Sequence, residues 1–391
     1  MYYKPDWEQA KQRMLAWWHH DAIDRCCVAV HARRNGSKLP PLPNLQYEMW
    51  LDGMDVIAED DHAALERWWT DPDLNYERAL RWFEGSYFGG EALPVTQVNW
   101  GAMAMAAMFG SPPVFSKTTV WYQPVIRDWD AWQWEFDPDT NPIWQSLLSI
   151  VTRLREGAEG RYFVGKPELG NGADVLSLMR GMDTLAMDLY AYPEQVKRGV
   201  DYISDIWVAL MEQVYQMTTR INDGGDVLAW MNLWAPGRID QIACDFSSLI
   251  SPAMFREFFV PEIVKMGRWC EYGTYHLDGP ACIKNMVDVL LEIDEIKAIQ
   301  FTPGSGAPPA YTPAYMPRYK QILRSGRNLY LLAAPDEIER ILAELPPEGL
   351  FLRTFVQSEE EAKELLKKVS QWSASRSSFV RPPWDAQDKA G

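Results

Sequence analysis

The sequence predicts an α/β fold, a (β/α)8 barrel with a helical insertion near the N-terminus. Two observations support this prediction. Eight short apolar runs are rich in β-branched and aromatic residues, and stretches with helical periodicity separate most of them. A chain of 391 residues, 47% of them hydrophobic, is long enough for one such barrel with extensions. A doubly wound open sheet is the alternative. No GxGxxG sequence follows any predicted strand, which argues against its dinucleotide-binding form.

Each of the eight runs has the length and composition of a buried strand, and the even spacing along the second half of the chain is typical of alternating strands and helices. The predicted strands are 26–32, 93–100, 161–166, 226–232, 273–278, 297–302, 328–333 and 349–355.

The helices are predicted from apolar periodicity and from their first residues. The stretch 193–220 begins with Pro and Glu, which a helix tolerates in its first turn. The stretch 251–272 begins with Ser251 as N-cap and a proline after it, and Pro261 should kink or break it. Further amphipathic stretches are 280–293, 313–326, 335–345 and 358–372.

Residues 33–92 are read as the insertion, which we expect to cap one end of the barrel. It contains a proline-rich stretch and two helical patterns, around 60–69 and 74–85. We predict a single domain over residues 1–375, followed by a polar, proline-bearing tail over 376–391.

Composition limits the classes of partner. The formal net charge of −16 predicts an acidic surface, which disfavours nucleic acid and anionic membranes. The five cysteines form no CxxC or other ligand spacing and indicate reduced thiols. No apolar run reaches the ~20 residues of a membrane span, and the N-terminus lacks signal-peptide features. We therefore expect a cytoplasmic protein.

In a barrel, chemistry lies at the carboxyl ends of the strands. The strand 273–278 ends in His276-x-Asp278, whose side chains point to the same face. Three interpretations remain open. The aspartate orients a histidine that acts as acid or base, or both residues bind a divalent metal, or Asp278 caps the next helix.

Other strand ends and turns supply further candidates. Asp245 lies between an apolar run and an N-cap serine, and is a turn residue or a substrate contact. Asn171 lies in a glycine-rich stretch, 170–181, that opens a helix and either cradles an anion or forms a plain turn. The 19 tryptophans form a bulky core or wall a pocket for a flat ring, a sugar or a quaternary amine.

Four segments resemble the uroporphyrinogen decarboxylase-like superfamily, in order and over roughly residues 90–370. More narrowly they resemble its corrinoid-linked methyltransferase homologues, often described as trimethylamine-corrinoid-type proteins. The segments are "LSLMRGMDTLAMDLYAYPEQV", "CDFSSLISPAMFREFFVPEI", "YHLDGPACIKNMVDVLLEI" and "AIQFTPGSGAP". The resemblance implies a (β/α)8 barrel with a funnel-like site at the C-terminal face. It also implies either methyl transfer through a corrinoid protein or decarboxylation of a porphyrinogen.

The chain departs from both family patterns. Zinc-dependent members carry His-x-Cys on strand five and another cysteine near strand eight. Here His276 matches the histidine, but Asp278 stands at the cysteine and Thr354 lies where strand eight ends. Since thiolates do much of zinc selection, only a harder, oxygen-rich zinc or other divalent metal site is expected at His276 and Asp278. Porphyrinogen decarboxylation needs clustered arginines, and "VHARRNG" (30–36) is only a faint match.

The expected function is a methyltransferase that demethylates a small methyl ether or amine and passes the methyl group to a corrinoid protein. His276 and Asp278 would protonate or polarise the leaving atom. Asp245, Asn171 and Gln300 would orient the substrate, and the pocket walls would be Trp100, Trp230 and Trp234.

Two alternatives differ in their needs. A decarboxylase or lyase of an aromatic, porphyrin-like or sugar acid would need Arg180 or Arg353 for the carboxylate, and no corrinoid partner. A non-catalytic barrel would only bind a ligand or a corrinoid protein. By family analogy alone we expect a homodimer.

Overall fold

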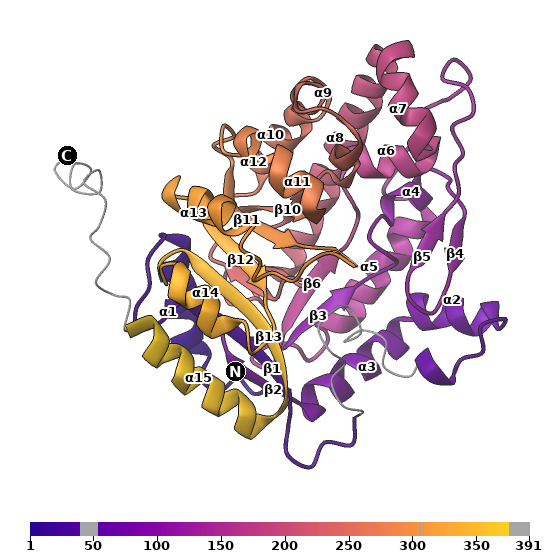
Figure 1. Ribbon diagram of the computed structural model, residues 1–391. Coiled ribbons are helices and arrows are strands. Elements are labelled where there is room, and N and C mark those ends of the chain that lie inside the picture. The colour runs from indigo at the N-terminus through magenta and orange to yellow at the C-terminus, as the bar shows by residue number, and fades with distance from the viewer. Residues whose placement is uncertain (40–53, 305, 375–391) are drawn as a thin grey trace.

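The structure is a computed structural model that describes residues 1–39, 54–304 and 306–374. A seven-stranded sheet forms its centre (Figure 1). The two strands at one edge are antiparallel, and all other neighbouring strands are parallel. The antiparallel pair comes first in the spatial order given next. The order is β2 (Ser86–Gly90), β1 (Cys27–Arg33), β13 (Leu350–Ser358), β12 (Asn328–Leu332), β11 (Ile296–Thr302), β10 (Gly273–Asp278) and β9 (Gln241–Ala243).

Three two-stranded pairs complete the strands of the described residues. The pair β3 (Val95–Val98) and β6 (Phe163–Pro167) is parallel. The pairs β4 (Pro113–Phe115) with β5 (Val120–Tyr122), and β7 (Asp226–Leu228) with β8 (Leu233–Ala235), are antiparallel.

Each of the eight predicted segments contains a strand, and the prediction of an α/β fold with a mostly parallel sheet is confirmed. The hydrogen-bonded ladders of the described residues leave β3 and β6 as a separate pair, so a closed ring of eight strands is not shown. The strands that the sequence did not predict have three to five residues. Runs of that length carry too little periodicity to be recognised.

Helices connect the strands and bury one apolar face each. The predicted helix 193–220 is observed as α8 (Pro193–Thr218). The predicted helix 251–272 is divided into α9 (Pro252–Phe258) and α10 (Val260–Trp269) just before Pro261, as expected. The Ser251 hydroxyl accepts a hydrogen bond from the Met254 amide and caps α9.

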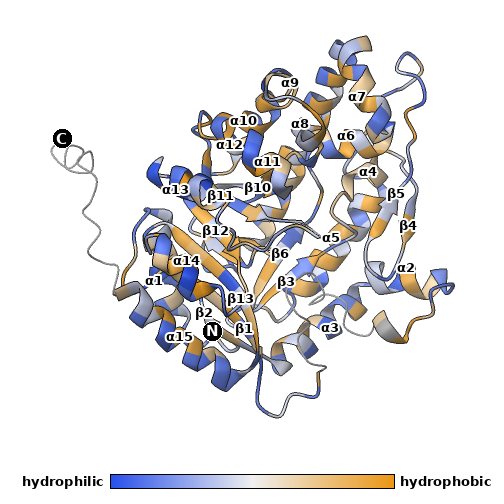
Figure 2. Ribbon diagram, viewed as in Figure 1, coloured by the Kyte–Doolittle hydropathy of each residue, from blue (hydrophilic) through white to orange (hydrophobic). Residues whose placement is uncertain are grey.

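Helices that precede α8 in the chain are α1 (Trp7–Trp18), α4 (Met105–Met108), α5 (Pro142–Arg155), α6 (Gly172–Arg180) and α7 (Met182–Ala191), besides two in the insertion that are described below. Those that follow β10 are α11 (Gly279–Asn285), α12 (Val287–Leu290), α13 (Met316–Arg324), α14 (Ile338–Glu344) and α15 (Glu359–Ala374). In Figure 2 the central strands are largely hydrophobic, whereas α15 shows mainly hydrophilic residues to the viewer. No helix among the described residues is long and apolar enough to cross a membrane.

The insertion contains the two predicted helices, α2 (His62–Thr70) and α3 (Pro72–Gly85), and then β2. Asp61 and Asp71 cap the two helices by accepting hydrogen bonds from backbone amides. Most of the proline-rich stretch and the predicted tail, 376–391, lie outside the described residues.

A buried lysine ties β6 to the segments beside it. The Lys166 ammonium donates to the Asp226 carboxylate over 2.6 Å, and to the carbonyls of Val227 and Ile239 over 3.1 and 2.8 Å. Asp226 is fully buried, and Lys166 nearly so. These bonds set the spacing between the end of β6, β7 and the start of β9.

Replacing Lys166 with methionine should lower the free energy of unfolding by about 3–5 kcal/mol, because Asp226 then remains buried without its counter-ion. Chemical denaturation measures this change. The double variant Lys166→Met/Asp226→Leu should recover much of the loss. A single variant as stable as the wild type would contradict this account of the junction.

Candidate functional site

A cavity of about 320 Å³ lies where the strands end at their carboxyl termini. Its volume is at the lower end of the roughly 300–1,000 Å³ that is typical of small-molecule sites. Most of its walls come from strand ends and from the segments just after them. These residues are Gln97, Asn99, Glu168, Trp230, Gln241, Asp245, His276, Gln300, Thr302, Tyr330, Leu332, Arg353 and Phe355. The loop 101–103, the hairpin tip at Thr118 and Thr119, and Trp69 of α2 complete it.

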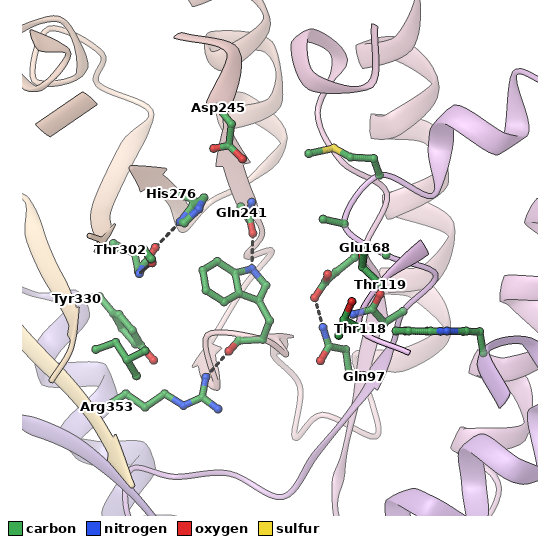
Figure 3. A pocket seen from close by; sticks show the side chains of 18 of the residues that line it. Gln97, Thr118, Thr119, Glu168, Gln241, Asp245, His276, Thr302, Tyr330 and Arg353 are labelled. Carbon is green, nitrogen blue, oxygen red and sulfur yellow. Dashed lines mark hydrogen bonds between the residues drawn. The ribbon is translucent and has the colours of Figure 1, made fainter. Parts of the chain in front are cut away.

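Five of the residues singled out from the sequence meet at this cavity: Trp230, Asp245, His276, Gln300 and Arg353. Figure 3 shows Asp245 and His276 on the side of η3 (Asp245–Leu249) and β10, with Glu168 and Gln97 across from them. Trp69 brings the insertion into the cavity wall.

Two other candidates support the cavity without lining it. The Asn171 side chain accepts a hydrogen bond from the Ala243 amide over 2.6 Å and so holds the backbone of β9. Trp100 is buried against Phe115, and its carbonyl accepts a hydrogen bond from the Tyr122 hydroxyl, which anchors the hairpin β4–β5.

Three candidates lie away from the cavity. Trp234 is a core residue, whose indole N–H donates to the Asn222 carbonyl and whose ring packs against Trp7. Arg180 forms an ion pair with Asp188 and bonds the carbonyls of Ile126 and Arg127, so it joins loops. Asp278 occupies the N-cap position of α11, but its side chain makes no capping hydrogen bond there.

The helix start at 172 does not offer a free anion site. The backbone N–H groups of Gly172 and Ala173 donate to the carboxyl oxygens of Glu262, a side chain of this same chain. The N-terminus of α6 is therefore already occupied by an internal carboxyl group.

The hydrogen bonds around His276 define its tautomer. Gln300 donates from Nε2 to the Thr302 hydroxyl, so its Oε1 is the acceptor for His276 Nδ1–H, at 2.5 Å. Burial lowers the pKa of His276, although Gln300 and the charges of Asp278 and Asp174 act in the opposite direction. The imidazole is therefore neutral at pH 7, and its Nε2 is an acceptor rather than an acid.

Asp245 is held by a second aspartate behind it. The Asp174 carboxylate accepts hydrogen bonds from the backbone N–H groups of Asp245 and Phe246, over 3.0 and 2.9 Å. Burial, and then the charge of Asp278, raise the pKa of Asp245 to about 6. Burial, and then the charge of Asp245, raise the pKa of Asp174 to about 7. At pH 7 Asp245 is thus mainly an anion.

Glu168 was not among the candidates from the sequence, although it directly follows β6. The Gln97 amide donates to its Oε1 (Figure 3). Burial raises the pKa of Glu168 to about 8, and the bond from Gln97 offsets only part of that effect. Glu168 is therefore a neutral carboxylic acid at pH 7, and its strand-end position was the one signal that pointed to it.

Arg353 supplies positive charge to the cavity wall. Its guanidinium donates to the Trp230 carbonyl and, over 3.3 Å, to His31 Nε2. The guanidinium carbon also lies 5.2 Å from the centre of the Phe355 ring. These contacts hold Arg353 in the wall, in the part of Figure 3 that also contains Tyr330.

Of the two residues that suggested a metal site, His276 lines the cavity and Asp278 does not. Among the described residues, no group of three or more His, Cys, Asp or Glu side chains is placed to hold an ion. All five cysteines are buried, and none lines the cavity.

Comparison with known proteins gives a likeness of fold. No protein-family model matches the chain, and no curated protein matches it. A solved structure described as a methyltransferase from Methanosarcina mazei superposes with a TM-score of 0.60 at 14% sequence identity. The match covers 93% of this chain and 98% of that one, so the two share an overall architecture.

Replacing Glu168 with glutamine should change how stability depends on pH. The folded-state pKa of about 8 exceeds the ordinary value, so folding retains a proton that the unfolded chain releases. The contribution of Glu168 to the free energy of unfolding is fully present below about pH 4.5 and is lost as pH rises to about 8. The melting temperature of Glu168→Gln should therefore increase relative to that of the wild type as pH rises from about 5 to 9. Differential scanning calorimetry measures this; a difference that stays constant with pH would contradict it.

Proposed function

We propose that this chain is a methyltransferase that removes a methyl group from a small ether or amine and delivers it to a corrinoid carried by a partner protein. The observation that carries the proposal is the position of Glu168, whose carboxyl group lines the cavity, accepts a hydrogen bond from Gln97 and has a pKa that burial raises to about 8. The structural likeness to a methyltransferase agrees with it.

The proposal includes a closed (β/α)8 barrel of the uroporphyrinogen decarboxylase-like kind. Two contacts support closure by joining the separate β3–β6 pair to the segment that contains β7 and β8. Lys166 links β6 to β7 and to the strand start at 239–241. Asn232 exchanges two hydrogen bonds with the backbone of Leu93, just before β3.

Proton delivery is the chemical step assigned to the chain. The bond from a methyl group to oxygen or nitrogen breaks readily only when the leaving atom gains a proton. Glu168 provides that proton from its carboxyl group, and Gln97 fixes the orientation of this group. The neutral His276 accepts a hydrogen bond from the substrate. Asp245 orients the substrate. The proton donor is thus Glu168, in place of the expected His276 and Asp278.

The corrinoid supplies the nucleophile that takes the methyl group. A cavity of about 320 Å³ admits a small substrate but not a corrin macrocycle, which agrees with a corrinoid held by a separate protein. Aromatic side chains at Trp69, Trp230, Tyr330 and Phe355 limit the water around the substrate.

Arg353 supports decarboxylation as the second candidate function. It places a guanidinium at the cavity, where a substrate carboxylate would pair with it. Release of carbon dioxide without any corrinoid would favour this candidate. Arg180, the other arginine considered, is committed to Asp188.

Incubation with cob(I)alamin and a panel of methyl donors tests the proposal. The donors are dimethylamine, trimethylamine, 2-methoxyphenol and 3-O-methyl-D-glucose, and methylcobalamin is followed by absorbance. We expect transfer from at least one donor. The rate should fall as pH rises through about 8, because Glu168 loses its proton. Glu168→Gln should lower the rate by about 10²–10⁴-fold.

Glu262→Gln is the matched control, because Glu262 is a buried carboxyl whose pKa is also raised to about 8, and it lies outside the cavity. It should leave the rate and its pH dependence unchanged. Transfer that is equally fast with Glu168→Gln would exclude Glu168 as the donor. Absence of transfer from every donor would count against the methyltransferase itself.

A further inference from the structure

The cavity walls contain buried oxygen acceptors that no described residue satisfies. Gln97 Oε1, Asn99 Oδ1 and Asp245 Oδ1 are buried and have no hydrogen-bond partner among residues 1–39, 54–304 and 306–374, and all three residues line the same cavity. Leaving such a group unpaired in a buried position is unfavourable, because its hydrogen bond to water has been lost. Three at one cavity indicate that the ligand supplies the missing donors.

These acceptors lie on different sides of the cavity, so a ligand that satisfies all of them must carry donors that point in several directions. Gln97 and Asn99 belong to the end of β3, whereas Asp245 begins η3 across the cavity (Figure 3). The orientation of the Gln97 amide follows from its donation to Glu168, which leaves Oε1 as an acceptor. An aspartate oxygen accepts in either orientation of the carboxylate.

Apart from His276, whose Nε2 accepts, the parts of the cavity considered next are apolar or donate. The indole N–H groups of Trp69 and Trp230 are already bonded, to the Ser116 carbonyl and to Gln241, so their rings are what remains for a ligand. Arg353 is a donor in the wall. The ligand must therefore combine an apolar face with an edge of groups that both donate and accept hydrogen bonds.

Hydroxyl groups around a saturated ring meet this description. A hydroxyl donates one hydrogen bond and accepts two, and the ring presents C–H groups to an aromatic face. A quaternary ammonium has no donor, and an aryl ether with one phenolic hydroxyl has one. The cavity of about 320 Å³ suits a single ring.

We propose that the substrate is a small cyclic polyol, of the monosaccharide or cyclitol class, that carries its methyl group as an ether. This inference rests on the proposed methyl transfer at the same site. Asp245, Gln97 and Asn99 accept hydrogen bonds from ring hydroxyls. Glu168 faces the ether oxygen, which gains its proton when the bond to the methyl carbon breaks and becomes one further hydroxyl of the product.

Binding measured by isothermal titration calorimetry tests the ligand class without turnover. The polyol probes are 3-O-methyl-D-glucose and D-pinitol. The comparison probes are methoxycyclohexane, 2-methoxyphenol and tetramethylammonium. We expect at least one polyol ether to bind about 100-fold more tightly than methoxycyclohexane, which has the ring and the ether but no hydroxyl.

The variant Asn99→Leu separates ligand recognition from structural support. It should weaken binding of the polyol ether about 10-fold and raise the melting temperature of the empty protein, because an unpaired buried acceptor is removed. Ser111→Ala is its control, since Ser111 Oγ is also buried without a partner but lies outside the cavity. It should leave binding unchanged.

Equal or tighter binding of any comparison probe would overturn the polyol assignment, as would a lack of binding by both polyol ethers at about 10 mM. Methyl transfer from an ether without hydroxyls would leave the methyltransferase proposal standing and remove the polyol. Tight binding of a polyol ether that never yields methylcobalamin would support the ligand class and count against methyl transfer.

Discussion

The arrangement of the site depends on the buried ammonium of Lys166. It binds Asp226 and two carbonyls, and so holds together the end of β6, the start of β7 and the segment that leads into β9. Three cavity residues follow these points along the chain: Glu168, Trp230 and Gln241. Since a charge in this position is tolerated only when it is fully paired, the junction admits little variation in geometry.

Burial then assigns the acid and base roles. In the same cavity wall, low polarity favours the neutral form of every titratable group, so Glu168 retains its proton whereas His276 gives its proton up. Asp245 has a less strongly raised pKa and is mainly charged at neutral pH. The cavity thus offers one proton donor, one neutral acceptor and one anion, the set that proton delivery to a leaving heteroatom requires. An assignment from residue type alone would have made the histidine the acid.

The sequence was sufficient to find all eight predicted strands, because each is a largely apolar run and most of its residues are buried. The rule that chemistry lies at strand ends pointed to His276, Gln300 and Arg353, and these three residues line the cavity. It did not separate cavity residues from structural ones. Trp234 follows the predicted strand 226–232, but it lies within β8 and packs on Trp7. Nothing in the sequence reports which side of so short a strand faces the core.

Glu168 and Trp69 illustrate what the sequence did not reveal. The role proposed for Glu168 depends on its environment. Gln97, which donates a hydrogen bond to it, comes from another strand, so this pairing can be recognised only in the folded chain. Trp69 reaches the cavity from the insertion. The sequence did not indicate which residues of the insertion would lie against the strand ends. The neutral acid and the aromatic wall therefore emerge from tertiary contacts.

The most direct test of this account is the pKa of Glu168 itself. Carboxyl carbons labelled with carbon-13 can be titrated by nuclear magnetic resonance, with the Glu168 signal assigned by its loss in Glu168→Gln. The account predicts a midpoint of about 8 for this signal. A midpoint near the ordinary glutamate value of about 4.3 would show that Glu168 is ionised at neutral pH, and would contradict its role as the proton donor.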